Sequence, residues 1–331
     1  DVSGSMNQPD KLPLLKSSLK MLVDQLNPED TIGIVTYAGY AGTALTPTKI
    51  SNKQQIIAVI DQLGAGGGTA GGEGIKNAYE LAQKHFNKGG INRVILATDG
   101  DFNVGITDPQ QLTKFIEEKR ETGVTLSILG FGKGNYNDAL MQKLAQNGNG
   151  NAAYIDTINE ARKVLVNEAG STLFTIAKDV KIQVEFNPQA VSQYRLIGYE
   201  SRMLKREDFN NDKIDAGEVG AGHAVTAIYE ITPVGSVGSV DELRYGKPQM
   251  LLVDKPSSNF SGEYGFLKTR YKLPNENESK LITTPINASV ESANIAQAPN
   301  DVRFSVAVAG FGQLLKSAPE VSGYGMGSVI A

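Results

Sequence analysis

The chain has 331 residues, which is long enough for two domains of ordinary size. Its 32 basic and 36 acidic residues give a formal net charge of −4, which creates no field strong enough to hold nucleic acid or an anionic membrane. It has no cysteine, so disulfides and thiolate metal sites are excluded, and no apolar run of 18 or more residues predicts insertion of this segment into a membrane.

The first six residues, Asp-Val-Ser-Gly-Ser-Met, alternate oxygen-bearing side chains with residues that carry none. Asp1, Ser3 and Ser5 are therefore expected on one side of the backbone, where they offer one carboxylate and two hydroxyls. Hard cations such as Mg²⁺ or Ca²⁺ prefer such an oxygen-only set to nitrogen or sulfur. The alternative for serines that precede a helix is capping, in which the hydroxyl accepts from a free backbone N–H group.

Helical and strand patterns then alternate along the chain. Leucines at helical spacing predict an amphipathic helix from Asp10 to Leu26, with Pro13 near its start. The following elements are expected in this order: a strand over 31–38, a short edge strand over 41–45, a helix over 51–63 capped by Ser51, a helix over 72–86, a strand over 93–98, a helix over 109–122, a strand over 124–131, a helix over 137–145, a strand over 152–155 and a helix over 158–168. This order predicts an α/β fold with a doubly wound, mostly parallel sheet, whose ligand site lies at the carboxyl ends of the strands.

Two later segments add oxygen atoms at loop positions. Residues 66–72, Gly-Gly-Gly-Thr-Ala-Gly-Gly, belong to a glycine-dense stretch that is too flexible for a helix interior and too long for a tight turn. One interpretation is a hinge or linker. The other is a loop whose backbone approaches a bound ion while Thr69 supplies a hydroxyl. Residues 97–100, Ala-Thr-Asp-Gly, place Asp99 where a predicted strand gives way to a loop.

In this order, the three segments resemble the metal-ion-dependent adhesion site of the von Willebrand factor A (VWA) domain family. Asp-x-Ser-x-Ser matches the first loop of that site, Thr69 its threonine loop and Asp99 its final aspartate. Two longer stretches are similar to bacterial YfbK-like VWA proteins: Thr-Asp-Gly-Asp-Phe-Asn-Val-Gly at 98–105, and Asp-Phe-Asn-Asn-Asp-Lys-Ile-Asp-Ala-Gly-Glu at 208–218.

The resemblance implies a Rossmann-like VWA domain over residues 1–168 that binds Mg²⁺, with Mn²⁺ or Ca²⁺ as substitutes. The implied metal ligands are Asp1, Ser3, Ser5, Thr69 and Asp99. It further implies that a carboxylate of a partner protein completes the coordination shell, so that the ion bridges two proteins. Because the first aspartate of VWA domains directly follows a buried central strand, we also expect such a strand upstream of Asp1. If Asp1 is instead the first residue, as in the sequence given, its α-amine would lie beside the ion, where its positive charge disfavours binding of the cation.

Past residue 170 the pattern changes to the apolar–polar alternation that is typical of strands with one wet face. Strands are expected over 179–186, 224–231, 250–253, 265–273 and 302–309, with no long helix between them. They predict an antiparallel, sandwich-like β domain over residues 169–331.

A second oxygen-rich run, at 208–218, begins like an EF-hand calcium loop. Its candidate ligands are Asp208, Asn210, Asp212, Asp215 and Glu218. However, Lys213 stands where EF-hands have glycine, and Val219 stands where they have the closing glutamate. A solvated loop rich in Asx turns is the alternative that these departures favour.

The sequence contains few of the motifs and residue types that enzymes require. The chain has no Gly-x-x-x-x-Gly-Lys-Ser/Thr phosphate loop, and its two histidines, His85 and His223, are too few for a His-rich zinc site. The leading hypothesis is a non-enzymatic, Mg²⁺-dependent protein-binding or adhesion module of a bacterial cell envelope or secreted protein, with a lipid anchor upstream as one form of attachment. The alternatives are an intracellular assembly factor that works with an ATPase, a structural surface repeat with an unused ion and, as a minor one, a metal-dependent hydrolase.

Overall fold

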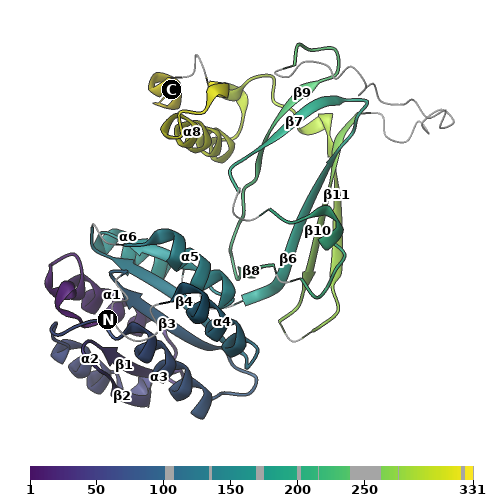
Figure 1. Cartoon of the computed structure of the whole chain (residues 1–331). Helices are drawn as coiled ribbons and strands as arrows, with labels where there is room; N and C mark the ends of the chain where they lie inside the picture. Colours follow the sequence, from purple (N-terminus) through teal and green to yellow (C-terminus); the bar gives the residue numbers. More distant parts are fainter. Residues whose placement is uncertain are drawn as a thin grey trace. The chain divides into compact units, whose positions relative to one another are not determined.

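The computed structural model describes residues 1–100, 108–133, 136–168, 175–199, 203–214, 216–238, 262–274, 276–321 and 325–330 (Figure 1). The chain divides into two compact units. Unit 1 comprises residues 1–178 and 217–223, and unit 2 comprises residues 179–216 and 224–331. The two units are therefore not two continuous halves of the sequence, because residues 217–223 belong to unit 1.

Helices and strands alternate through the first 167 residues as the sequence predicts. The elements are η1 (Gly4–Asn7), α1 (Leu12–Gln25), β1 (Thr31–Tyr37), β2 (Ala41–Lys49), η2 (Ile50–Asn52), α2 (Lys53–Gln62), α3 (Gly71–Lys84), β3 (Asn92–Thr98), α4 (Pro109–Arg120), β4 (Val124–Phe131), α5 (Asp138–Asn147), β5 (Ala152–Ile155), α6 (Ile158–Arg162) and the π-helical turn η3 (Lys163–Asn167). The predicted α/β fold class is confirmed.

Two sheets form the centre of unit 1. β3, β4 and β5 are parallel and adjacent in that order, whereas β1 and β2 pair antiparallel. The backbone of the first residues bonds to both sheets, since the Asp1 amino group donates to Ala97 O and Val2 N–H donates to Tyr37 O, each at 2.9 Å. These bonds hold Asp1 at the carboxyl ends of β1 and β3. The strand expected ahead of Asp1 stays a prediction.

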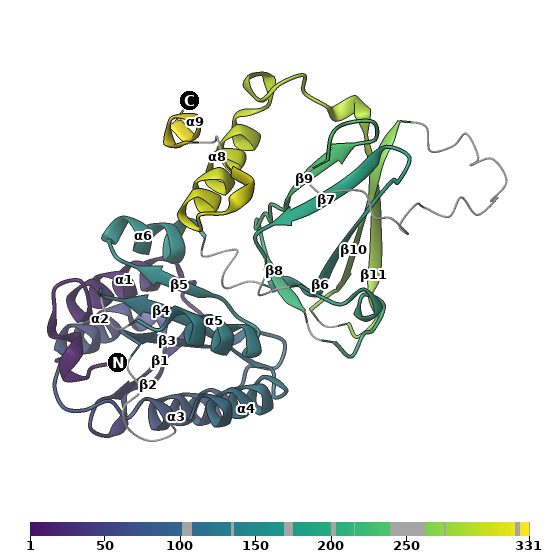
Figure 2. The same ribbon diagram turned by 45° about the horizontal axis from the view of Figure 1, so that its top comes forward.

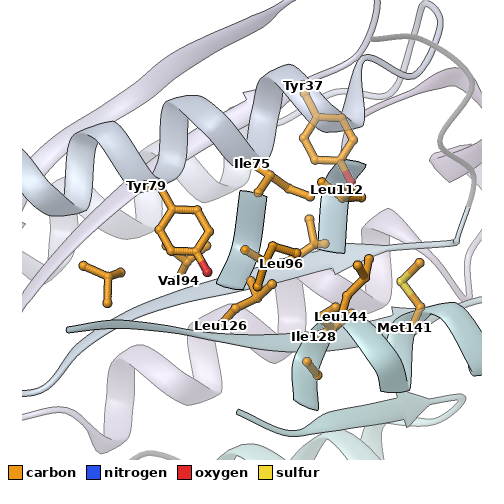
Figure 3. Packing of buried hydrophobic residues seen from close by; sticks show 13 residues of the cluster. Tyr37, Ile75, Tyr79, Val94, Leu96, Leu112, Leu126, Ile128, Met141 and Leu144 are labelled. Atoms are coloured by element: carbon orange, nitrogen blue, oxygen red, sulfur yellow. The ribbon is translucent and has the colours of Figure 1, made fainter. Parts of the chain in front are cut away.

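Side chains of the parallel sheet alternate between two buried clusters, because successive residues of a strand point to opposite faces. On one face, Leu96 and Ile128 pack with side chains of α3, α4 and α5 (Figure 3). On the other face, Leu129 and Phe131 pack with side chains of α1, α6 and η3. Helices thus cover both faces of this sheet (Figure 2), and the packed core fixes the loops at its carboxyl edge.

The expected cap of the second helix is wrong. α2 begins at Lys53, its N-cap residue is Asn52, and no side chain caps it. Ser51 lies one residue earlier, in the 3₁₀ turn η2. The helix itself is as predicted, and its Ile56 and Ile60 are buried in a third hydrophobic cluster.

Antiparallel strands dominate the rest of the chain, as predicted. Its elements are β6 (Thr175–Phe186), β7 (Val191–Ile197), η4 (Arg206–Asp208), β8 (Gly217–Gly220), β9 (Ile228–Pro233), β10 (Glu263–Lys272), β11 (Lys280–Asn287), η6 (Ala288–Val290), η7 (Ile295–Gln297), α8 (Asn300–Leu315), η8 (Pro319–Val321) and α9 (Met326–Ile330). One sheet has the order β11-β10-β6-β8, and a second consists of β7 and β9; the pairs β10–β11 and β7–β9 are antiparallel. The strand expected over 250–253 lies outside the described residues.

The strand expected over 302–309, and with it the expected absence of a long helix, is wrong. The segment forms α8, a helix of 16 residues with Asp301 in its first turn, where a negative charge favours the helix N-terminus. Its valines suggested a strand, but each costs a helix only about 0.5 kcal/mol relative to alanine. Near the other end, Arg195 of β7 donates to the buried Gln313 at 3.1 Å. Among the helices that the structure describes, none is long and apolar enough to cross a membrane.

Candidate metal centre

Backbone hydrogen bonds hold the glycine-rich loop beside the first residues of the chain. Gly4 N–H donates to Gly67 O at 3.0 Å, and Gly66 N–H donates to Val2 O at 2.8 Å. Gly67 has a φ of +79°, a conformation that favours glycine. Thr69 follows two residues later and is buried. Two loops that are more than sixty residues apart in sequence therefore run side by side.

The carboxylate of Asp1 joins the first loop to the end of β3. Its Oδ1 accepts from Ser3 N–H and its Oδ2 accepts from the Thr98 hydroxyl, each at 2.9 Å. The Thr98 hydroxyl oxygen in turn accepts from Gly100 N–H at 3.0 Å. Both oxygens of Asp1 are thus engaged within the protein, and they position the turn that carries Asp99.

The hydroxyls of Ser3 and Ser5 form a hydrogen bond of 3.0 Å, in which either one can donate. Ser3 is the N-cap residue of η1, yet its side chain makes no capping hydrogen bond, so capping does not explain this serine. In an octahedral shell with Mg–O distances of 2.0–2.1 Å, neighbouring ligand oxygens are about 2.9 Å apart. The two hydroxyls therefore stand at the spacing of adjacent ligands of one ion.

Asp99 is the buried carboxylate of the centre, with 2% of its surface exposed. Its Oδ2 accepts from Lys11 Nζ at 2.9 Å, whereas its Oδ1 is buried and has no hydrogen-bond partner among the residues that the structure describes. An unsatisfied buried carboxylate oxygen is costly, and a bound cation would satisfy it. The donor set, two carboxylates with neutral hydroxyls, fits a hard divalent cation.

The remaining ionisable groups of the centre are neutral near pH 7. Burial lowers the pKa of the Asp1 α-amine to about 5, although the negative charge of Asp99 opposes the shift. The expected repulsion between this amine and a bound cation stays a prediction. Burial raises the pKa of the Tyr37 phenol above its usual value, and the charge of Asp99 adds to this effect.

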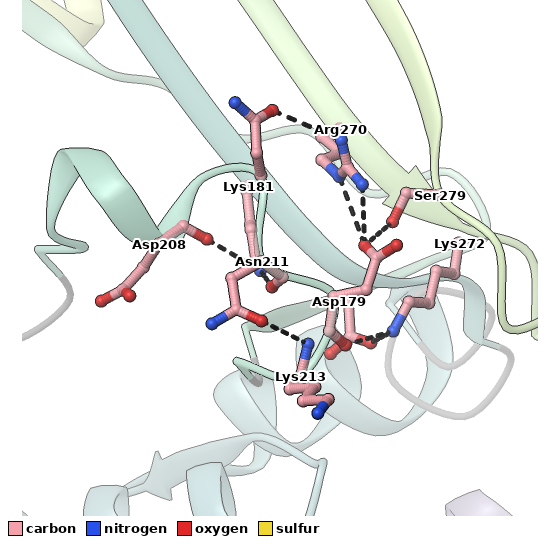
Figure 4. Close-up of polar contacts among 10 residues, drawn as sticks. Asp179, Lys181, Asp208, Asn211, Lys213, Arg270, Lys272 and Ser279 are labelled. Carbon is pink, nitrogen blue, oxygen red and sulfur yellow. Dashed lines mark hydrogen bonds and ion pairs between the residues drawn. The ribbon is translucent and has the colours of Figure 1, made fainter.

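Cationic side chains fill the second candidate site (Figure 4). Asp212 Oδ1 accepts from Arg270 at 3.0 Å and from the Ser279 hydroxyl, and these contacts hold the pKa of Asp212 below its usual range. Lys181 Nζ donates to the carbonyl oxygens of Asp208 and Asn211. A calcium ion at this loop would have to compete with ammonium and guanidinium groups.

Two other candidates of this run interact with arginines. Asn210 accepts from Arg270 at 3.4 Å, and Glu218 lies on β8, where its charge acts on Arg93. Asp215 lies outside the described residues. In the part of the chain that the structure describes, no three Asp, Glu or His side chains cluster as a metal-binding group. Calcium binding at 208–218 stays a prediction.

Two residues of the first centre are not indicated by any pattern in the sequence. Thr98 belongs to the quoted motif beside Asp99, and its β-strand position directs its hydroxyl at Asp1. Lys11 was expected only as part of a helix, and no local pattern indicates that it reaches Asp99, 88 positions away.

Known proteins match both parts of the chain. The von Willebrand factor type A domain family matches residues 1–167, and the family described as "Uncharacterized protein YfbK, C-terminal" matches residues 171–331. The uncharacterized protein YfbK of Escherichia coli (strain K12) is 48% identical over 316 residues, which cover 96% of this chain and 53% of that protein. The uncharacterized protein sll0103 of Synechocystis is 30% identical over 162 residues, which cover 49% of this chain and 37% of that protein.

A solved structure, the von Willebrand factor type A protein from Catenulispora acidiphila, shares the fold. It has a TM-score of 0.50 at 18% identity and covers 94% of this chain and 70% of its own. The chain spans about half the length, or less, of the curated relatives given above.

Proposed function

Because the chain belongs to the von Willebrand factor type A domain family and carries the C-terminal domain of the YfbK proteins, we propose that it is a non-enzymatic module that binds a partner protein through a divalent cation. In this proposal the Mg²⁺ site is formed by Asp1, Ser3, Ser5, Thr69 and Asp99, with Asp99 as the carboxylate that contacts the ion directly and Asp1 as the one that orders the loops around it. An acidic side chain of the partner completes the shell. The activity and partners of a longer protein that contains this segment are part of the same proposal.

One observation carries the proposal: Asp99 presents a buried carboxylate oxygen without a hydrogen-bond partner, in a centre where two hydroxyls stand at the spacing of neighbouring metal ligands. The site is polar and buried, and Asp99 Oδ1 is a strong acceptor in it that no described group satisfies. Such groups are rare in folded proteins and indicate an ion or ligand that completes them.

The use of Asp1 supports an acidic partner. Both oxygens of Asp1 already accept hydrogen bonds from the protein, so Asp99 is the carboxylate that can reach the ion directly. One carboxylate and neutral hydroxyls leave a divalent ion with excess positive charge. A carboxylate supplied by a second protein is the ligand that such an ion prefers.

The proposed location is the bacterial cell envelope or the outside of the cell. The relatives from Escherichia coli and Synechocystis support a bacterial source. A signal peptide or a lipid-modified cysteine in the complete reading frame would support this location. A neighbouring ATPase gene without an export signal would instead favour an intracellular assembly factor.

The proposal is tested by capture of partners from a native bacterial extract on the immobilised chain, with Mg²⁺ or with EDTA. We expect partners to be retained with Mg²⁺ and lost with EDTA. Asp99→Ala should abolish capture, because it removes the free carboxylate oxygen. Asp61→Ala is the matched control, since it removes an exposed carboxylate of α2. Equal retention in all four conditions would contradict ion-bridged binding.

A further inference from the structure

Lys11 lies at the N-cap position of α1, and its side chain runs into the metal centre instead of to solvent. Only 6% of the residue is exposed, and its ammonium group donates to Asp99 Oδ2 at 2.9 Å. By comparison, Lys20 of the same helix pairs with Asp61 with 37% and 52% of the two side chains exposed. Buried lysines are rare in proteins, so the position of Lys11 requires a reason.

The fold makes room for this side chain. Gly132 lies against its methylene groups, and a Cβ at that position would stand 2.3 Å from Lys11 Cε. Gly132 also has a φ of +79°, which favours glycine. The lack of a side chain at Gly132 therefore leaves the space through which the Lys11 side chain reaches Asp99.

In the centre without a bound ion, the ammonium group of Lys11 is the cation that Asp99 contacts. It satisfies one carboxylate oxygen and leaves the other without a partner. A buried carboxylate without any positive partner would be strongly destabilising, so the contact with Lys11 stabilises Asp99 in its buried position. A metal ion that binds Asp99 must then share this carboxylate with Lys11 or displace it.

The charges of the centre show what Lys11 does once an ion is bound. Asp1 and Asp99 against Lys11 leave one negative charge in excess. A divalent ion turns this into one positive charge in excess, and one carboxylate from outside makes the centre neutral. Without Lys11, the ion and the two aspartates would already be neutral, and an external acid would gain less.

We infer that Lys11 sets both the ion affinity and the acid preference of this centre: its ammonium group competes with the cation for Asp99 and keeps the loaded centre positively charged, so that an acidic ligand binds. The inference rests on the proposed function. It adds that the same lysine weakens ion binding and strengthens capture of the acid, which couples the two events.

The first test is calorimetric titration of the full chain with Mg²⁺ and with Mn²⁺ after removal of ions by EDTA and dialysis. Lys11→Met keeps the apolar stem and removes the charge, and we expect its dissociation constant to be lower by about tenfold or more. Lys11→Arg keeps the charge and should stay within about threefold of the unchanged chain. Lys20→Met, the control on the exposed face of α1, should leave the constant unchanged.

The second test uses acetate as the acidic probe on the Mg²⁺-saturated proteins. Acetate binding should weaken by about tenfold in Lys11→Met and persist in Lys11→Arg and Lys20→Met.

Thermal unfolding without metal measures how much the Lys11–Asp99 pair stabilises the protein. Lys11→Gln serves as a second neutral variant beside Lys11→Met. Lys11→Met and Asp99→Asn should each lower the unfolding temperature, and the double variant should lower it by less than their sum.

The outcomes separate the inference from the proposed function. If the unchanged chain binds the ion and Lys11→Met binds it equally or more weakly, the inference on Lys11 is wrong while ion binding stands. If Lys11→Met binds acetate as well as the unchanged chain does, the acid preference has another source and the inference is wrong. If no protein binds Mg²⁺ or Mn²⁺, both are wrong.

Discussion

Tyr37 connects the packing of α3 with the metal centre. It ends β1, and its carbonyl oxygen accepts from Val2 N–H inside the first loop. Its ring lies against Gly74 of α3, where an added Cβ would stand 2.4 Å from Cδ1 of the ring. Gly74 is therefore required by close approach and not by backbone conformation. A change at this helix position acts on a residue that supports the centre.

Gly74→Ala should lower the free energy of unfolding by about 1–3 kcal/mol, because the added methyl group overpacks the core. In an open helix position the same change stabilises by about 1 kcal/mol, so the sign of the effect is diagnostic. Urea unfolding followed by circular dichroism measures it. Gly64→Ala is the control: no atom lies within 4 Å of its added Cβ, and we expect a change within about 0.5 kcal/mol. A stabilised Gly74→Ala variant would contradict the packing at Tyr37.

Single residues of the centre differ in how far the sequence predicts them: Asp1, Ser3 and Ser5 are predicted, whereas Thr98 and Lys11 are missed. Asp1, Ser3 and Ser5 are found by their alternation within one short segment. Lys11 cannot be found in this way, because its contact with Asp99 depends on where the fold brings two remote positions together. Local patterns report on local geometry, and a charge pair across a fold leaves no such pattern.

At the scale of elements, β10 sends two lysines to acidic residues of β6, and the two pairs differ in burial. Lys272 pairs with Asp179 at 2.6 Å, with 9% and 16% of the side chains exposed. Lys268 pairs with Glu185 at 3.4 Å, with 31% and 62% exposed. Because both lysines lie on the same strand and contact the same neighbour, they form a matched comparison of a buried and an exposed ion pair.

Lys272→Met should lower the free energy of unfolding by about 2 kcal/mol, because the largely buried Asp179 loses its ion pair with Lys272. Lys268→Met should change it by less than about 1 kcal/mol, since exposed ion pairs contribute little. Urea unfolding of the full chain gives both values. Equal effects of the two variants would show that burial does not distinguish these pairs.

The elements of the first 167 residues follow from the sequence more closely than those after residue 170. Helices that bury one face on a parallel sheet must place apolar residues at helical spacing, as Ile56 and Ile60 do in α2. β11 was not predicted, because its first six residues are exposed and show no alternation between a buried and a wet face. α8 was mistaken for a strand because its apolar residues occur on all sides of the helix, so the sequence carries no helical period.

At the scale of the whole molecule, the buried hydrophobic side chains are distributed unevenly. The three clusters that the described residues form all lie within residues 1–165. In unit 2, the buried hydrophobic side chains among the described residues are Val191 and Phe209. The buried polar residues of this unit, among those described, are Lys181, Lys272 and Gln313. The candidate metal centre thus belongs to the unit with the packed core. Composition alone could not predict this, because it averages over both units.

Ion binding should therefore stabilise unit 1 and leave unit 2 unchanged. At a free Mg²⁺ concentration of 100 times the dissociation constant, linkage stabilises the binding-competent unit by about 2.7 kcal/mol. Amide hydrogens of β3 and β4 that exchange through opening of unit 1 should then exchange about 100-fold more slowly, while those of β10 and β11 keep their rates. Hydrogen exchange with mass spectrometry of the full chain, with Mg²⁺ or with EDTA, measures both regions at once.

Asp99→Ala is the control for this experiment, because it removes the unsatisfied carboxylate oxygen and should make exchange in β3 and β4 insensitive to Mg²⁺. Slower exchange in all four strands would mean that the two units unfold together. The expectation that ion binding leaves unit 2 unchanged would then be wrong. Slower exchange in β10 and β11 alone would place the ion in unit 2, at the acidic loop that Lys181 and Arg270 now neutralise. The experiment thus distinguishes the two candidate ion sites by the unit that each one stabilises.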